Sequence, residues 1–220
     1  MDSTHLNFVI EGSGTPCLVI GSSVYYPKTF SKNLREHYRF YFVDLHWFAK
    51  GYTLVKSENF TLETIISDIE KARQALQLEK PLLIGHSIHG TIAMEYTKRY
   101  PQNVSGLVMI GSPSIWASDT YNKAASAYWE TAPAERKAID EKSREELQER
   151  LAQLPPDKVM AANYIASSAR YWYDPEYDAG WLWEDMVVNN DLISHLFGTI
   201  FLGYDMFENM NKLDVPVLLV

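Results

Sequence analysis

A single serine stands where an apolar segment passes into an amphipathic one. The run over residues 82–90 reads Leu-Leu-Ile-Gly-His-Ser-Ile-His-Gly. This pattern predicts a strand that turns sharply through Ser87 into a helix. A serine hydroxyl is a poor nucleophile unless the fold exposes it in a cleft and a base removes its proton, and a strained strand-to-helix turn provides the exposure. Ser87 is therefore the candidate nucleophile.

The elements that would position this turn are strands alternating with helices. Apolar runs predict strands, and positions at helical spacing predict helices, one of them capped by Thr61. Such alternation predicts an α/β fold, a mostly parallel sheet flanked by helices. The predicted strands cover residues 6–10, 16–20, 40–43, 82–86, 104–110 and 215–220, and the predicted helices cover 28–37, 61–76 and 88–100.

The character of the sequence changes between residues 112 and 214. No convincing strand appears there, whereas charged helical stretches such as 135–154 and clusters of aromatic residues do. We interpret 1–111 as the N-terminal part of the core, 112–214 as an inserted helical cap, and 215–220 as the next core strand. Five of the six tryptophans lie in this cap: Trp116, Trp129, Trp172, Trp181 and Trp183.

Two interpretations of these aromatic residues stay open. They could line a pocket for a small, mostly apolar molecule, with Trp116 and Trp172 as candidate lining residues. Alternatively, the rings pack the cap's own core and its seam with the sheet.

Composition excludes several classes of protein. The net charge of −8, without a basic run, argues against nucleic acid or an anionic membrane as a partner. A single cysteine, Cys17, allows neither an internal disulfide nor a cysteine-based zinc site, and its apolar surroundings predict core packing. The N-terminus lacks the features of a signal peptide, and no apolar run could span a membrane. We expect a cytoplasmic protein.

These features together resemble the α/β-hydrolase superfamily, and within it the cap-bearing, proline-iminopeptidase-like and small-ester hydrolases. The matching residues are the turn at 85–90, Tyr100-Pro101, and the strands over 42–45 and 104–111. The family's nucleophile elbow is usually Gly-x-Ser-x-Gly. Here His89 stands at the second glycine position and Gly90 comes one residue later.

The resemblance implies further site residues. The oxyanion hole would use the backbone N–H groups of Ile88 and Ser22. His46 and Trp47 would lie near the mouth of the pocket, and neither a metal nor an organic cofactor is implied. The loop over 21–27 lacks both the family's usual His-Gly start and the glycine- and proline-rich loop of proline iminopeptidases.

The family's triad also requires an acid and a histidine, in the chain order serine, acid, histidine. By resemblance both positions lie beyond Val220, with Asp119 and His195 as weaker alternatives within the chain. We therefore expect a C-terminally truncated fold that lacks its final strand and helix and is nearly inactive on its own. The apolar strand 215–220 would then leave one edge bare, which predicts self-association.

Three functions remain open. The first is a serine hydrolase acting on an ester, amide or related acyl bond of a small molecule. The second is a non-catalytic binding protein of the same fold. The third is a cofactor-free haloperoxidase or carbon–carbon bond hydrolase that uses the same serine.

Overall fold

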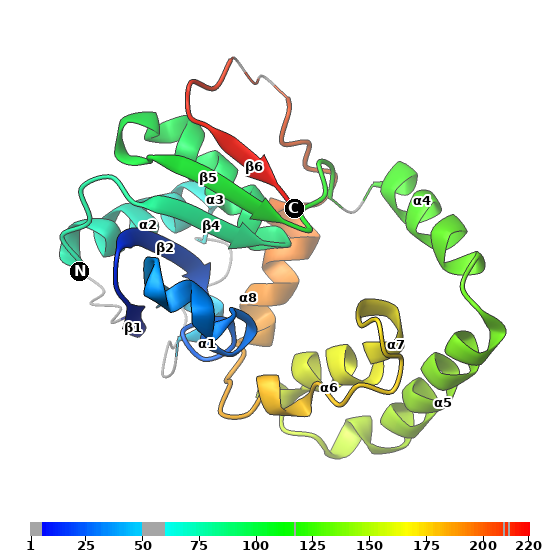
Figure 1. The fold of residues 1–220 in the computed structure, drawn as a ribbon. Coiled ribbons are helices and arrows are strands. Elements are labelled where there is room, and N and C mark those ends of the chain that lie inside the picture. Colours follow the sequence, from blue (N-terminus) through cyan, green and yellow to red (C-terminus); the bar gives the residue numbers. More distant parts are fainter. Residues whose placement is uncertain (1–5, 50–59, 117, 209, 211) are drawn as a thin grey trace.

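A computed structural model describes residues 6–49, 60–116, 118–208, 210 and 212–220. Within them, six strands form one sheet in the order β1-β3-β2-β4-β5-β6 (Figure 1). β1 is antiparallel to β3 and the other neighbouring pairs are parallel, which confirms the predicted α/β class. The strands are β1 (Phe8–Gly12), β2 (Thr15–Gly21), β3 (Tyr38–Asp44), β4 (Leu82–His86), β5 (Gly106–Ile110) and β6 (Val217–Leu219).

Neighbouring residues of a strand face opposite layers of the core. Leu18 of β2 packs in the layer that contains helices α2 (Leu62–Ala75) and α3 (Ile88–Arg99). Its neighbour Cys17 packs in the other layer, next to α1 (Tyr26–Thr29). Cys17 is fully buried, as predicted, and burial raises the pKa of its thiol to about 12. A strand covered on both faces reads as a continuous apolar run, which explains the sequence of β2.

Helix α2 begins as predicted, because the Thr64 N–H donates to the Thr61 hydroxyl at 3.2 Å. The helix is tied to α3 through Glu70. The carboxylate of Glu70 accepts hydrogen bonds from the Tyr96 hydroxyl at 2.5 Å and from the Arg73 guanidinium at 2.7 and 2.9 Å. The hydrogen bond from Arg73 holds the pKa of Glu70 at about 2, below its ordinary value of 4.5.

Glu70→Gln is expected to destabilise the protein in a pH-dependent way. Because the pKa of Glu70 is depressed in the folded state, the carboxylate stabilises the fold above its ordinary pKa, and this contribution is lost as the pH falls towards 2. Denaturant unfolding should therefore show a difference between variant and wild type that is largest at pH 7 and shrinks towards pH 3. Glu63→Gln is the control, since Glu63 is an exposed residue of the same helix. An equal loss in both variants would contradict the prediction.

The predicted helix over 28–37 is interrupted. The backbone is extended at residues 30 and 31, and the Arg35 guanidinium donates to the carbonyl groups of Phe30 and Ser31 at 3.0 and 3.1 Å. These carbonyls are thus satisfied by a side chain in place of helical N–H groups. The segment forms α1 and then a 3₁₀ turn, Lys32–Glu36.

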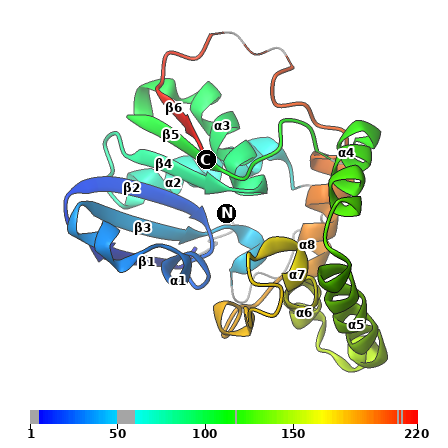
Figure 2. The same cartoon turned by 45° about the vertical axis from the view of Figure 1, so that its right-hand side comes forward.

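The described residues between β5 and β6 are helical or irregular, apart from one isolated bridge between Ile115 and Asp205. Helices α4 and α5 form an arch that stands away from the sheet, and α8 returns beside the sheet (Figures 1 and 2). No helix in this or any other described part is long and apolar enough to cross a membrane. The helices are α4 (Asp119–Glu130), α5 (Ala134–Arg150), α6 (Val159–Ala166), α7 (Ser168–Tyr171) and α8 (Asn190–His195). The boundaries of the cap at 112 and 214 stay a prediction.

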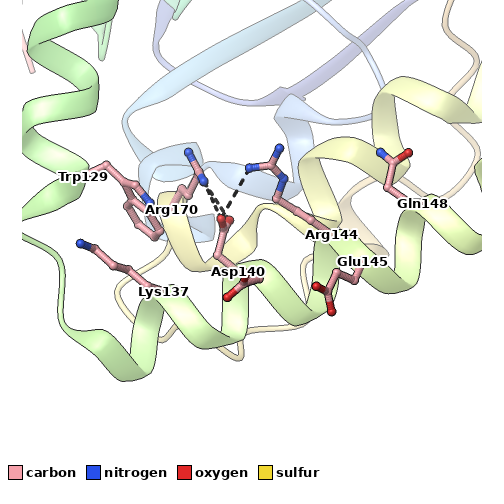
Figure 3. A pocket seen from close by; sticks show the side chains of 8 residues that line it. Trp129, Lys137, Asp140, Arg144, Glu145, Gln148 and Arg170 are labelled. Carbon is pink, nitrogen blue, oxygen red and sulfur yellow. Dashed lines mark hydrogen bonds and ion pairs between the residues drawn. The ribbon is translucent and has the colours of Figure 1, made fainter.

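One acid of α5 is not a solvated surface group. Asp140 is buried and accepts hydrogen bonds from Arg170 of α7 at 2.8 and 2.5 Å. The Arg170 guanidinium also lies 4.4 Å above the ring of Trp129 in α4. These side chains line an open pocket of about 450 Å³ whose lining residues come from α4, α5 and α7 (Figure 3). Asp140 in the charged sequence of α5 therefore forms, with Arg170, the ion pair that joins α5 to α7.

The strand predicted over 215–220 is present as β6, which pairs with β5 with Val217 opposite Leu107. Its residues are 40–71% exposed, and so is Val220. An apolar strand with an unpaired edge is a template for pairing with another chain. We expect the 220-residue chain to self-associate in a concentration-dependent way, measured by size-exclusion chromatography with light scattering, and Leu218→Lys to reduce that association. A wild-type chain that stays monomeric at high concentration would contradict this.

Candidate active site

Ser87 occupies the turn between β4 and α3 with an unusual backbone conformation, φ 56° and ψ −128°. Few non-glycine residues adopt positive φ, and such strain costs roughly 1–3 kcal/mol. The turn is held from both sides of Ser87. Its N–H donates to the carbonyl of Ile110 at 2.9 Å, and its carbonyl accepts from the Ser112 hydroxyl at 2.8 Å and from the Gly90 N–H at 3.0 Å. The hydroxyl of Ser87 does not cap α3.

Two glycines allow strand and helix to cross closely at this turn. A Cβ atom on Gly85 would lie within 2.6 Å of the Gly90 nitrogen and would also collide with the carbonyl of His89. A Cβ on Gly90 would collide with the side chain of Ser112. Gly90 therefore lies at the close approach that the family pattern assigns to a glycine one residue earlier.

The His89 side chain points away from this crossing. Its Nδ1 lies 2.7 Å from the Tyr26 hydroxyl, and its ring stacks on Trp47 with ring centres 5.7 Å apart. Burial lowers the pKa of His89 to about 3, so the imidazole is neutral near pH 7. Burial also lowers the pKa of His86, whose Nδ1 lies 3.5 Å from the same hydroxyl.

The predicted oxyanion residues lie at the ends of neighbouring elements. Ile88 is the first residue of α3, where N–H groups have no partner within the helix and the helix dipole favours negative charge. Ser22 directly follows β2, which neighbours β4 in the sheet. β2 and β4 are parallel neighbours with Val19 opposite Ile84, so Ser22 and Ser87 each follow the carboxyl end of one of two adjacent strands.

The Ser22 side chain stabilises its own loop. Its hydroxyl accepts hydrogen bonds from the N–H groups of Val24 and Tyr25 at 3.2 and 3.1 Å. Next to it, the Ser23 N–H donates to the buried carboxylate of Asp44 at 2.5 Å. The loop that would supply an oxyanion donor is thus fixed by polar contacts.

His46 and Trp47 lie in a 3₁₀ turn after β3, and both are buried. The Nε2 of His46 lies 3.2 Å from a carboxylate oxygen of Asp68 in α2. The carbonyl of Trp47 accepts from the Asn189 N–H at 2.8 Å, which attaches the start of α8 to the core. Their predicted place at the pocket mouth stays a prediction.

The two candidate pocket tryptophans, Trp116 and Trp172, contact different parts of the fold. Trp116 is buried, and its Nε1–H donates to the Thr91 hydroxyl of α3 at 2.6 Å, as expected of a residue at the seam between helical region and sheet. Trp172 is half-buried, and its ring centre lies 4.9 Å from that of Tyr177.

No histidine of the described residues forms a hydrogen bond with the Ser87 hydroxyl. The Nε2 of His195 instead lies 2.9 Å from the carbonyl oxygen of Phe60. Asp119 lies in the first turn of α4 and is exposed. In the described part of the chain, no group of three or more histidine, cysteine, aspartate or glutamate side chains could hold a metal ion.

An aromatic connection that no sequence pattern indicated joins the loop over residues 21–27, called the oxyanion loop below for its predicted role, to the helical region over 112–214. The Tyr25 ring packs on Trp183 with centres 5.0 Å apart, and Trp183 stacks on Tyr164 at 5.3 Å. Lys28 of α1 reinforces this connection by donating to the carbonyl of Trp181 at 2.8 Å. Tyr25 was the available signal, although its partner Trp183 lies about 160 residues later in the chain and no local pattern links the two.

Comparison with known proteins agrees with this geometry. A family model described as alpha/beta hydrolase fold matches residues 16–163. The AB hydrolase superfamily protein YclE of Bacillus subtilis (strain 168) is 33% identical over 216 residues, which are 98% of this chain and 76% of that protein. A proline iminopeptidase of Neisseria gonorrhoeae is 30% identical over only 74 residues, 34% of this chain and 24% of the relative.

Solved structures resemble the chain at lower identity. VinJ aligns with a TM-score of 0.69 at 13% identity, covering 100% of this chain and 78% of that one. A hydrolase from Pseudomonas aeruginosa PA01 aligns with a TM-score of 0.59 at 18% identity, covering 97% of this chain and 74% of that one. At such identities the likeness supports the fold alone.

Proposed function

The chain belongs to the α/β-hydrolase family, and from this premise we propose that Ser87 is the nucleophile of a serine hydrolase acting on an ester, amide or related acyl bond. The observation that carries the proposal is the strained backbone of Ser87 at the turn between β4 and α3. Residues in such conformations cluster at functional sites, where the surrounding structure maintains them. Here the close crossing of β4 and α3 at Gly85 and Gly90 maintains the strained backbone of Ser87.

In the proposed reaction the Ser87 oxygen attacks the acyl carbon, and the carbonyl oxygen acquires negative charge. The N–H groups of Ile88 and Ser22 donate to that oxygen. The position of Ile88 at the start of α3 supports this role, because the helix dipole adds to the donation. The base takes the Ser87 hydroxyl proton and gives it to the leaving group as the bond between that group and the acyl carbon breaks, and water, activated by the same base, then hydrolyses the acyl-enzyme.

The base and the acid that this mechanism requires are proposed to follow Val220 in the chain. Two observations support this assignment. The histidines of the described residues make no hydrogen bond to Ser87, and the match to YclE covers only 76% of that protein. Without its base, a serine hydrolase keeps little more than the effects of binding and the oxyanion hole, so the 220-residue chain should hydrolyse esters very slowly.

The proposed substrate is a small, mostly apolar molecule. Tyr25, Trp183 and Tyr164 support this, because they form a connected aromatic group between the oxyanion loop and the helical region. A tyrosine phenol is protonated at neutral pH at its ordinary pKa, and burial raises the pKa of Tyr25 and Tyr164 further. The surface they offer is therefore uncharged. Cytoplasmic location remains a prediction.

The test is hydrolysis of p-nitrophenyl esters of increasing acyl length. We would compare the 220-residue chain with a chain extended by the coding sequence that follows Val220 in the gene. The proposal expects the extended chain to be faster by at least roughly 10³-fold, with Ser87→Ala at background. Trp183→Ala should raise KM more for long acyl chains than for acetate. An extended chain without Ser87-dependent hydrolysis would contradict the proposal.

One observation favours the second candidate, a non-catalytic binding protein. Within the described residues, Ser87 has no hydrogen-bonded base. A gene that stops after Val220, together with tight binding of small apolar molecules and no hydrolysis, would support this alternative.

A further inference from the structure

We propose that His89 is a positioning residue of the active site, which fixes the oxyanion loop to the nucleophile turn through its hydrogen bond with Tyr26. The inference rests on the proposed function of Ser87 and Ser22. It assigns a role to the residue that replaces glycine in the family's pattern.

His89 belongs to the nucleophile turn. It lies two residues after Ser87 in the first turn of α3 and is only 6% exposed. Two aromatic residues hold its ring in place: Trp47 stacks on it, and the ring centre of Phe48 lies 5.8 Å away. The Nδ1 atom is thereby directed at the Tyr26 hydroxyl, 2.7 Å away.

Tyr26 belongs to the oxyanion loop. It is the first residue of α1 and is 5% exposed. Its N–H donates to the carbonyl of Ser22 at 3.4 Å, so the two ends of the loop are bonded to each other. The loop begins at Gly21, where a Cβ atom would lie 2.5 Å from the Tyr26 ring and 2.9 Å from Nδ1 of His89. Both side chains thus press against the backbone directly before Ser22.

The two ring nitrogens of His89 indicate that this side chain does more than fill space. The Nε2 of His89 is buried and has no hydrogen-bond partner among the described residues. Leaving such an atom unsatisfied is costly, and an apolar ring of the same shape would avoid that cost. What histidine adds over a phenyl ring is the bond from Nδ1 to Tyr26. Because His89 is neutral at ordinary pH, this bond does not depend on its charge.

The consequence for catalysis concerns the Ser22 N–H. An oxyanion donor contributes only when it is held within a few tenths of an ångström of its productive position. The bond between His89 and Tyr26 joins the two elements that carry the two donors, β2 with its loop and α3. Loss of the bond should therefore lower kcat while leaving KM nearly unchanged.

The first experiment measures loop dynamics and needs no activity. Amide hydrogen exchange is compared between the wild-type chain and Tyr26→Phe, which removes the hydroxyl and keeps the ring. Loss of one neutral hydrogen bond should accelerate exchange in peptides covering residues 21–27 by roughly 5–10-fold. Tyr96→Phe is the matched control, because it removes a buried hydroxyl bonded to Glu70 elsewhere in the fold. Unchanged exchange over 21–27 in Tyr26→Phe would overturn the inference, whether or not the protein is a hydrolase.

The second experiment measures ester hydrolysis by the extended chain, which includes the coding sequence that follows Val220. Tyr26→Phe and His89→Phe should each lower kcat by about 10–100-fold with KM within about twofold. His89→Asn should restore part of the rate, since its side-chain oxygen can stand close to the position of Nδ1. Wild-type kcat in Tyr26→Phe would overturn the inference while leaving the role of Ser87 intact. Absence of hydrolysis in the wild type would instead contradict the proposed function.

Discussion

Gly85→Ala is expected to destabilise the fold severely. The added Cβ would lie 2.5–2.6 Å from backbone atoms of His89 and Gly90, and backbone atoms cannot rotate away as a side chain can. Relief would require β4 and α3 to separate at the centre of the sheet. Overpacking of this kind typically costs 1–3 kcal/mol and occasionally more, and we expect a value above about 3 kcal/mol here.

The matched control is Gly198→Ala. Gly198 lies in a helical segment, Leu196–Ile200, and a Cβ atom there would meet nothing within 4 Å. Alanine is the better helix former, so this variant should be as stable as the wild type or slightly more stable. Thermal and denaturant unfolding of both variants measure the difference. Equal stability of the two variants would mean that the crossing is not as close as described.

Ser87→Gly should remove catalysis and make the protein more stable. Glycine adopts a φ of 56° without the steric cost that serine bears, so we expect a gain of about 1 kcal/mol in unfolding free energy. Loss of the nucleophile should lower ester hydrolysis by up to about 10⁶-fold in a chain with a complete triad. Thermal unfolding and steady-state rates with p-nitrophenyl butyrate measure the two effects.

Two further variants separate the backbone effect from the chemical one. Ser87→Ala removes the hydroxyl but keeps the strain, so it should lose activity without gaining stability. Gln77→Gly relieves a φ of 56° directly after α2, outside the turn between β4 and α3, and should gain stability without losing activity. If Ser87→Gly is no more stable than Ser87→Ala, the backbone of Ser87 is not strained.

The sheet and its central turn were predictable because their signals are local. Strands buried on both faces appear as continuous apolar runs, and α2 shows its cap at Thr61. The helix over 28–37 was not predictable in the same way. Its interruption depends on Arg35 reaching back to carbonyl groups, a contact that leaves no trace in hydrophobic periodicity.

The candidate site was predictable at Ser87 and less so around it. The departure of His89 from the family pattern was visible, but its partner Tyr26 lies 63 residues earlier in the chain. The aromatic residues of 112–214 were recognised as a group, yet sequence alone could not separate Trp183, which contacts the oxyanion loop, from Trp116, which packs on α3. Contacts between distant segments are set by the tertiary fold and have no periodic signature.

The central claim is that Ser87 is an activated nucleophile in the native protein. The most direct measurement is mass spectrometry of the protein isolated from its source after reaction with a fluorophosphonate probe, which forms a covalent adduct with activated serines. We predict a single adduct on the peptide that contains Ser87, lost in Ser87→Ala. An unmodified Ser87 peptide in folded native protein would contradict the claim and favour a binding function.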